Sequence, residues 1–280
     1  MGKVWLITGA SSGFGRELAS AVLERGDSVV ATARRPEQLD DMVARYGDRV
    51  RAVRLDVTDK EAVAAAVRTA TGAFGSLDVV VNNAGYANLG SVEELPDDDF
   101  RAQIETNLFG VVNVTKAVLP VLRAQRSGHI IQFSSIGGRV GGTPGLGAYQ
   151  TAKFGVEGYS EVLANEVKHL GIKVTIVEPG GFRTKWSGGA AVAAAAISDD
   201  YQPSVGEFLR FMESYRGAEP GDPARAAQAL IKVAGTEEPP LRLLLGSDAL
   251  QLAREASMAR ASEAEEWAEL TVSTDYPQSA

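Results

Sequence analysis

The chain contains no cysteine among its 280 residues and only two histidines, His129 and His169. Without a thiol, a disulfide framework, a thiolate zinc site and a cysteine nucleophile are all excluded. Two histidines so far apart in the sequence also disfavour a histidine metal site or a serine–histidine triad. The acidic run "PDDDF" at 96–100 is interpreted as a helix start, where carboxylates complement the helix dipole. The sequence therefore predicts no metal centre.

The chain also lacks a long cluster of lysine and arginine, and its net charge is −8. This balance argues against nucleic acid or an anionic membrane surface as the main partner. No stretch of about 18 uncharged apolar residues occurs, and the opening "MGKVWLITGASSG" enters a strand pattern with no cleavable signal before it. We expect a cytoplasmic protein that acts on a small molecule, without a membrane or nucleic-acid partner.

What the sequence does contain is an alternation of short β-branched runs with longer helical patterns. Seven runs predict strands, namely "KVWLIT", "SVVATA", "RVRAVRL", "LDVVVN", "GHIIQFS", "IKVTIVE" and "LRLLLG". Strands that are apolar on both faces and are each followed by a helix indicate a parallel sheet covered on both sides. The prediction is a doubly wound α/β sheet, a Rossmann fold, with ligands at the carboxyl ends of the strands.

The chain is predicted to form one domain over residues 1–280, with two additions. Residues 185–222, between the sixth and seventh strands, would hang over the strand ends, and we interpret them as a substrate lid; the alternative is a helical embellishment without that role. Its apolar residues Trp186, Phe208, Phe211, Met212 and Tyr215 suit a hydrophobic substrate, although aromatic residues at helical spacing are more often core. Residues 247–280 are expected to form a C-terminal helical extension with a frayed end.

A glycine-rich turn follows the first predicted strand. In "TGASSGFGR", Gly9, Gly13 and Gly15 allow a tight turn, a close approach of the backbone to a pyrophosphate, and close packing of helix on strand. The start of the following helix favours negative charge. No Gly-Lys-Ser/Thr follows, so the turn is not a P-loop. A dinucleotide site is predicted.

The second predicted strand ends in "VVATARRPEQL". An enzyme that prefers NAD would carry an Asp or Glu here for the ribose 2′-hydroxyl. This chain has Arg34 and Arg35 instead, and a guanidinium suits a 2′-phosphate through charge-assisted contacts. The prediction is NADP(H), with NAD(H) possible, and Arg34 is the favoured contact; the alternative is that both arginines are simply solvated in a loop.

Several motifs in order along the first two thirds of the chain resemble the classical short-chain dehydrogenase/reductase family. They are "TGASSGFG" at 8–15, "LDVT" at 55–58, "NNAG" at 82–85, "TNLFG" at 106–110, "FSSIGG" at 133–138, "YQTAK" at 149–153 and "EPGGFRT" at 178–184. The "IGGRVGG" turn and the long C-terminus resemble the steroid and retinol dehydrogenase side of the family.

The resemblance implies a set of cofactor-binding residues. Asp56 would bind the adenine amine with Val57 beside it, Asn83, Ala84 and Gly85 would line the ribose, and Asn82 would be structural. The full set is Gly9, Ser11, Ser12, Gly13, Phe14, Gly15, Arg34, Arg35, Asp56, Val57, Asn83, Ala84, Gly85, Tyr149, Lys153, Pro179, Gly180, Phe182 and Thr184. The segment from Pro179 to Thr184 would hold the nicotinamide carboxamide.

The pair Tyr149 and Lys153 is four residues apart on a predicted helix, and such pairs also occur as ordinary neighbours on solvated helices. The family resemblance implies that they are catalytic, together with Asn107 and Ser135. Because the spacing from Ser135 to Tyr149 is one residue longer than is commonest in the family, Ser134 is the alternative to Ser135. Asn107 could instead only kink a helix.

These residues imply an NADP(H)-dependent oxidoreductase that transfers a hydride between nicotinamide and a carbonyl or secondary alcohol. Tyr149 would be the general acid/base, with its pKa lowered by the Lys153 ammonium and the oxidised nicotinamide. A hydrophobic ketone, aldehyde, steroid-like or retinoid-like substrate and a homo-oligomeric state, dimer or tetramer, are expected. The alternatives are a non-catalytic NADP(H)-sensing protein, a 3-oxoacyl-thioester reductase, or an epimerase or dehydratase of the extended relatives.

Overall fold

The computed structural model describes residues 2–184, 191–193 and 197–276 of the chain. Within these ranges, seven parallel strands form the main sheet in the order β3-β2-β1-β4-β6-β7-β9. The strands are β1 (Val4–Ile7), β2 (Ser28–Ala33), β3 (Val50–Arg54), β4 (Val79–Asn82), β6 (Gly128–Phe133), β7 (Ile172–Pro179) and β9 (Arg242–Leu245). The chain order reverses between β1 and β4, so the predicted doubly wound sheet is confirmed, and this reversal is where such sheets bind ligands.

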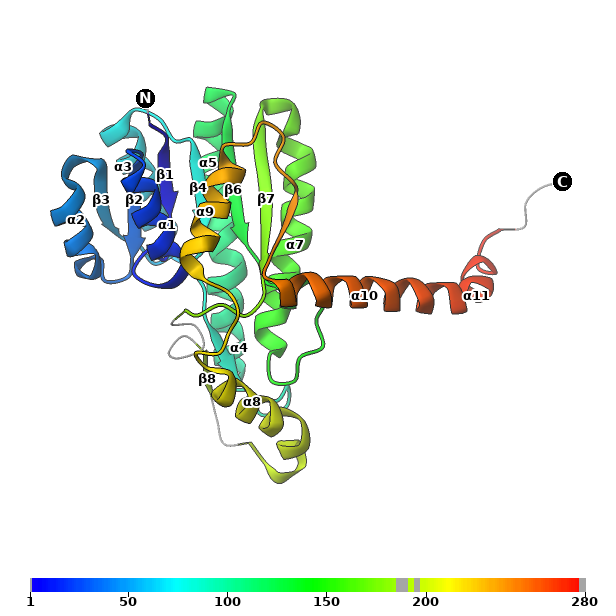
Figure 1. Ribbon diagram of the computed structural model, residues 1–280. Coiled ribbons are helices and arrows are strands. Elements are labelled where there is room, and N and C mark those ends of the chain that lie inside the picture. The colour runs from blue at the N-terminus through cyan, green and yellow to red at the C-terminus, as the bar shows by residue number, and fades with distance from the viewer. Residues whose placement is uncertain (1, 185–190, 194–196, 277–280) are drawn as a thin grey trace.

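Helices cover both faces of the sheet, as the apolar strands require (Figure 1). One core lies under α1 (Gly13–Glu24), α2 (Asp40–Tyr46) and α9 (Pro223–Ala234). The other lies under α3 (Lys60–Phe74), α5 (Gly110–Gln125) and α7 (Gly147–Val167). Because the central strands are buried on both sides, their side chains hold the strand ends, and the loops that leave them, in fixed positions.

Two helical features lie beyond what the sequence analysis predicted. A π-helical turn, Glu105–Phe109, which contains Asn107, separates α4 (Asp97–Ile104) from α5. Helix α9 was not predicted, although its start carries clear signals: the Asp222 carboxylate accepts hydrogen bonds from the N–H groups of Ala224 and Arg225, and Pro223 is the first helical residue.

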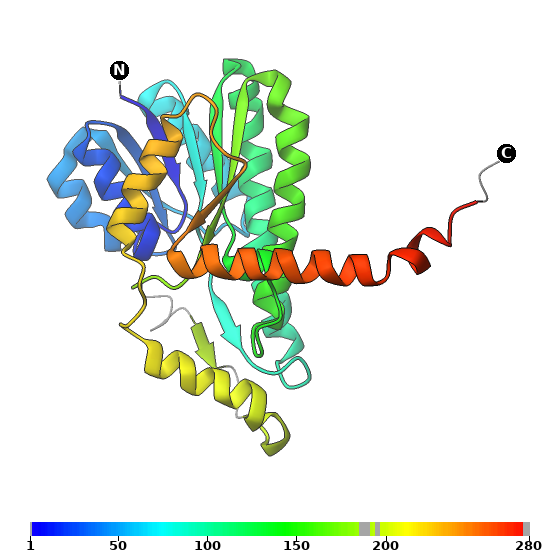
Figure 2. The ribbon, with the colours of Figure 1, turned by 45° about the vertical axis from the view of Figure 1, so that its right-hand side comes forward.

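The insertion and the C-terminal extension lie at the carboxyl-end edge of the sheet (Figure 1). The insertion contributes β8 (Ala191–Ala193), which pairs in parallel with β5 (Ala87–Leu89), and α8 (Glu207–Tyr215). The extension forms α10 (Ser247–Glu266) and the short α11 (Ala268–Val272). Figure 2 shows α10 starting beside the sheet and projecting away from the body.

Most side chains on the outer part of α10 and on α11 are exposed, including Met258, Trp267, Leu270 and Val272. The first turns of α10 pack on the body, with Ala249 and Ala253 buried, and Arg260 farther along contacts the Val140 carbonyl. In the described ranges, no helix combines the length and the apolar character needed to cross a membrane.

Candidate active site

A single cavity of about 1000 Å³ runs along the carboxyl ends of the strands. Its lining includes nearly every residue that the sequence predicted for the site, from the glycine turn through Arg34 and Asp56 to Ser135, Tyr149 and Lys153. Gly15 and Asn107 are the two predicted residues that do not line it. The fold therefore brings together motifs that are spread over residues 9–184.

The glycine turn between β1 and α1 forms one end of this cavity. Gly9 and Gly13 have φ angles of 68° and 54°, in the left-handed region that favours glycine. A Cβ atom on Gly15 would lie 2.5 Å from the Gly9 carbonyl oxygen, so only glycine allows the helix to pack this closely. Gly15 acts through packing, which explains why it does not line the cavity.

The start of α1 is suited to an anion. Its N-cap residue, Ser12, makes no side-chain cap hydrogen bond, and the first turn contains no acidic residue. The first N–H groups of a helix have no partner within the helix and carry partial positive charge. Uncapped N–H groups beside a cavity fit the pyrophosphate of a dinucleotide.

Two asparagines at the end of β4, Asn82 and Asn83, have different structural roles. The Asn83 side-chain amide donates to the carbonyls of Thr8 and Gly9, at 2.9 and 3.2 Å, and so holds the glycine turn from the neighbouring strand. Asn82 is buried and donates to the Gln132 side-chain carbonyl at 2.8 Å. Asn82 thus stabilises the sheet interior, as expected.

Arg34, Arg35 and Asp56 line the far end of the cavity, beyond the end of β2. Burial pushes the pKa of Asp56 upward, but hydrogen bonds from Thr58 and the charge of Arg34 outweigh it, so that the pKa lies below its ordinary value. Both arginines are exposed at the cavity rim. This end of the cavity therefore has one carboxylate whose ionised form is favoured, Asp56, and two exposed guanidinium groups, Arg34 and Arg35.

Tyr149 lies on the first turn of α7 with its side chain almost fully buried. Burial raises the pKa of its phenol to about 12, and a side-chain hydrogen bond with Ser135 opposes this rise. Ser135 is the N-cap residue of α6 (Ile136–Arg139). Ser134 also lines the cavity, but its hydroxyl lowers the pKa of Glu157 rather than that of Tyr149. Of the two serines, Ser135 is therefore the one beside Tyr149.

Lys153 lies one helical turn after Tyr149, and its ammonium donates a hydrogen bond to the Phe133 carbonyl at 2.7 Å. Burial lowers the pKa of Lys153 to about 8, and the nearby charge of Glu157 opposes this shift. The Lys153 Nζ atom is 5.6 Å from the centre of the Tyr149 ring. Burial therefore moves the pKa of each group toward its neutral form.

Asn107 is fully buried in the π-helical turn behind the cavity. Its side chain accepts from the Tyr86 N–H at 3.0 Å and donates to the Tyr86 carbonyl at 2.8 Å. A Cβ atom on Gly85 would lie 2.8 Å from the Asn107 Oδ1 atom and 3.7 Å from the Lys153 Nζ atom. Asn107 and Lys153 thus both lie close to Gly85.

The segment after β7 closes the cavity beside the glycine turn. The Phe182 ring packs against Phe14 with 4.9 Å between ring centres, and Phe14 packs in turn on Phe133. Pro179, Gly180, Phe182 and Thr184 all line the cavity. The aromatic contacts join the segments after β1, β6 and β7.

Gln150 is a cavity residue that sequence reasoning missed. Its side chain donates to the Thr143 hydroxyl at 3.0 Å and accepts from the Thr143 N–H at 3.3 Å. These bonds hold the glycine-rich loop after α6, which contains the extra residue between Ser135 and Tyr149, against α7. A polar residue next to Tyr149 was the only available sequence signal.

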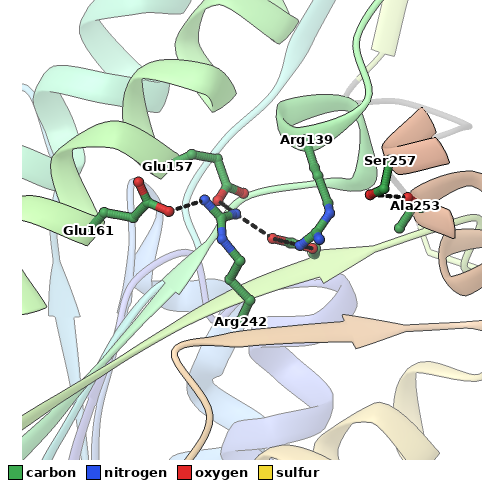
Figure 3. A network of polar contacts seen from close by, with 7 residues as sticks. Arg139, Glu157, Glu161, Arg242, Ala253 and Ser257 are labelled. Carbon is green, nitrogen blue, oxygen red and sulfur yellow. Dashed lines mark hydrogen bonds and ion pairs between the residues drawn. The ribbon is translucent and has the colours of Figure 1, made fainter. Parts of the chain in front are cut away.

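A partly buried ionic network is centred on Arg242 (Figure 3). The Arg242 guanidinium bonds Glu157 and, at 2.6 Å each, Glu161 and Glu178. Arg139 bonds Glu178 at 3.2 Å. Burial raises the pKa of Glu157 to about 7, helped by Glu178 and opposed by Ser134 and Arg242. The network ties α6, α7, β7 and β9 together, and sequence reasoning assigned none of its members a role.

The described part of the insertion contributes side chains to the cavity wall. Phe208, Phe211, Met212 and Tyr215 line it, and Trp186 lies outside the described residues. Leu146 from the loop before α7 and Leu252 from α10 add to this wall. This part of the wall is largely apolar, with Gln150 and Glu219 as polar elements.

Comparison with known proteins agrees with this geometry. Residues 3–191 match the family model described as short chain dehydrogenase, and the chain belongs to the short-chain dehydrogenase/reductase family. It is an oxidoreductase of that family, whose members bind NAD(P)(H).

Three relatives show how far the likeness extends. The chain is 50% identical to oxidoreductase BOA17 of Botryotinia fuckeliana over 98% of this chain and 100% of that protein. It is 39% identical to the 3-ketodihydrosphingosine reductase of Bacteroides thetaiotaomicron, over 87% and 88% of the two chains. A solved short-chain dehydrogenase from Streptomyces avermitilis superposes with a TM-score of 0.89 at 42% identity, covering 99% of this chain and 100% of the other.

Proposed function

We propose that the protein is an NADP(H)-dependent carbonyl reductase or alcohol dehydrogenase in which Tyr149 is the general acid/base. The observation that carries the proposal is the convergence of Tyr149, Ser135 and Lys153 on the cavity that starts at the glycine turn. When bound, the nicotinamide supplies or accepts the hydride. The protein residues bind and orient the cofactor and the substrate, and they protonate the carbonyl oxygen.

Each catalytic side chain has a separate task in reduction. Ser135 holds the carbonyl oxygen, and Tyr149 gives that oxygen its proton as negative charge develops. A phenol with a pKa of about 12 remains protonated at neutral pH and is ready to donate. Lys153 positions the ribose hydroxyls and provides positive charge near the phenol, and Asn107 secures the backbone at Tyr86 and supports proton resupply to Lys153.

The preference for NADP(H) over NAD(H) is proposed from Arg34 and Arg35. Both line the cavity at its adenine end, where a guanidinium can bind a 2′-phosphate with two parallel hydrogen bonds.

The proposed substrate is a hydrophobic ketone or secondary alcohol that enters under a lid formed by residues 185–222. The supporting observation is the apolar wall of Phe208, Phe211, Met212 and Leu252. The Bacteroides relative is named as a reductase of a keto group on dihydrosphingosine, which fits this class. We also propose a homo-oligomer, which size-exclusion chromatography with light scattering would test.

Tyr149→Phe tests the proposed function. With a panel of hydrophobic ketones, the wild-type protein is expected to oxidise NADPH, seen as a loss of absorbance. The variant should lose at least about a hundredfold in turnover, because general acid catalysis contributes that much, while its Kd for NADPH stays close to that of the wild type. Equal turnover in the variant would refute the role of Tyr149. NADPH binding without oxidation of any carbonyl by the wild type would favour the non-catalytic sensing protein.

A further inference from the structure

The first turns of α10 are part of the cavity wall, although the sequence suggested only a peripheral extension. Asp248 lies in the first turn of α10, and Leu252 follows one turn later; both line the cavity. Asp248 also faces the segment after β7, which the proposed function assigns to the nicotinamide.

The Asp248 carboxylate holds the backbone of that segment directly. Its Oδ2 atom accepts a hydrogen bond from the Gly181 N–H at 2.7 Å, across 67 positions of sequence. Asp248 is the acidic residue in the first turn of α10, whose N-cap residue is Gly246. From this position its carboxylate also binds the Gly180–Gly181 turn.

The surrounding backbone is shaped to admit this carboxylate. A Cβ atom on Gly180 would lie 2.3 Å from the Asp248 Oδ1 atom, and one on Gly246 would lie 2.5 Å from it. Any larger residue at either position would displace the side chain. Within the described residues, Oδ1 is buried and has no hydrogen-bond partner. A carboxylate oxygen in this position costs desolvation free energy, so the bond from Oδ2 to Gly181 must offset that cost.

The other contacts of the turn come from different elements. The Gly180 N–H donates to the Leu245 carbonyl at 2.9 Å, and the Gly181 carbonyl accepts from the Gly221 N–H at 3.0 Å. Asp248 supplies the partner for the remaining Gly181 N–H. Farther along α10, Arg260 donates to the Val140 carbonyl at 2.8 Å, at the end of α6. The helix thus contacts both segments that carry the site, after β6 and after β7.

We propose that Asp248 is a positioning residue that fixes the Gly180–Gly181 turn for dinucleotide binding, making the first turn of α10 a part of the cofactor site. This inference rests on the proposed function, because that function assigns the turn to the cofactor. Asp248 acts through the backbone it holds, so its effect appears first in cofactor affinity.

The experiment compares Asp248→Ala with Asp248→Asn by titrating NADPH fluorescence at neutral pH. Loss of a hydrogen bond to a charged acceptor should weaken NADPH binding about tenfold or more in Asp248→Ala. Asp248→Asn keeps an oxygen that can accept from Gly181 and should remain within about threefold of the wild type. Glu263→Ala, an exposed carboxylate on the same helix, is the matched control and should leave the Kd unchanged.

Thermal unfolding of each variant shows whether it is folded. If Asp248→Ala does not fold, Asp248→Ser replaces it, because serine suits a helix start but has a shorter side chain. The same weakening of NADPH binding is then expected for Asp248→Ser. Wild-type affinity in the Ala or Ser variant, or equal weakening in Ala and Asn variants, overturns the positioning role and leaves the proposed function standing. Failure of the wild type to bind NADPH or NADH overturns both.

Discussion

At the scale of single residues, the site depends on side chains whose charge is set by burial. Tyr149 and Lys153 are neighbours on one helical face, yet burial moves their pKa values in opposite directions, to about 12 and about 8. Both shifts favour the neutral form of each group. A positive charge placed beside Tyr149 would lower the pKa of its phenol. An oxidised nicotinamide would carry such a charge and would therefore favour the phenolate in alcohol oxidation.

Arg34→Ala tests the source of cofactor preference. If Arg34 binds the 2′-phosphate, the variant should lose about ten- to a hundredfold in affinity for NADPH, since a hydrogen bond to a charged group contributes about 1.5–3 kcal/mol. Affinity for NADH, which lacks that phosphate, should change little and is the internal control. Fluorescence titration of both cofactors measures the ratio. An unchanged ratio would contradict the role given to Arg34.

Glu157→Gln tests the charge of the buried network. Burial raises the pKa of Glu157 from 4.5 to about 7, so between these pH values the folded protein holds a proton that the unfolded chain has released. The contribution of this group to the free energy of unfolding is therefore full below pH 4.5 and is lost as the pH rises through 7. The shift corresponds to about 3 kcal/mol.

The glutamine variant has no such proton to lose. As the pH rises from 5 to 8, the wild type should lose up to about 3 kcal/mol of unfolding free energy that the variant does not lose. Urea titrations of both proteins at several pH values measure this difference. Glu161→Gln is the matched control, because it removes an exposed carboxylate from the same Arg242 guanidinium. If the difference in free energy of unfolding between Glu157→Gln and wild type stayed constant from pH 5 to pH 8, Glu157 would be ionised in the folded protein over that whole range.

At the scale of elements, some features follow from local sequence and others do not. The seven strands are predictable because runs of valine, isoleucine and leucine that are buried on both faces have few alternatives. The π-helical turn at Asn107 and the pairing of β5 with β8 lack such a signal. They arise from contacts between distant segments, as in the hydrogen bonds that tie Asn107 to Tyr86.

The residues of the site also divide into those that local sequence motifs indicate and those that depend on contacts between distant segments. The glycine turn, Tyr149 and Lys153 were predictable because each motif is contiguous and resembles a known family. The partners Arg242 and Glu157 are 85 positions apart, and Asp248 and Gly181 are 67 apart. Nothing in either local sequence indicates the other partner, so only the folded chain reveals these contacts.

Phe211→Ala tests the lid function of α8. Phe211 lines the cavity, is 54% exposed, and stacks on Tyr215 with 5.1 Å between ring centres. Removing its ring should raise the KM for a bulky hydrophobic ketone about tenfold, because burial of an aromatic side chain contributes about 1.5–3 kcal/mol. The KM for a small ketone should change little.

Steady-state kinetics with both ketones measures this effect. Trp267→Ala, which removes an exposed aromatic residue outside the cavity, is the matched control. An equal change in KM for the large and the small ketone would contradict a lid that selects for hydrophobic bulk.

At the scale of the whole molecule, the described structure divides its tasks between two edges of the sheet. The amino-terminal ends of the strands carry the connections from the covering helices. The carboxyl ends carry the glycine turn, Ser135, Tyr149 and Lys153, α8 and the base of α10. Loop changes at the second edge can therefore alter the substrate without disturbing the two cores, as is general for folds of this type.

The projecting α10 gives the molecule a shape that solution methods should detect. Its 20 residues, at 1.5 Å each, span about 30 Å, roughly the diameter of a small domain. The part of this helix that extends beyond the body slows rotational tumbling and raises the frictional ratio above that of a sphere of equal mass. Arg254 and Arg260 are exposed on it, and trypsin cleavage there would shorten the arm while leaving Asp248 and Leu252 at the cavity.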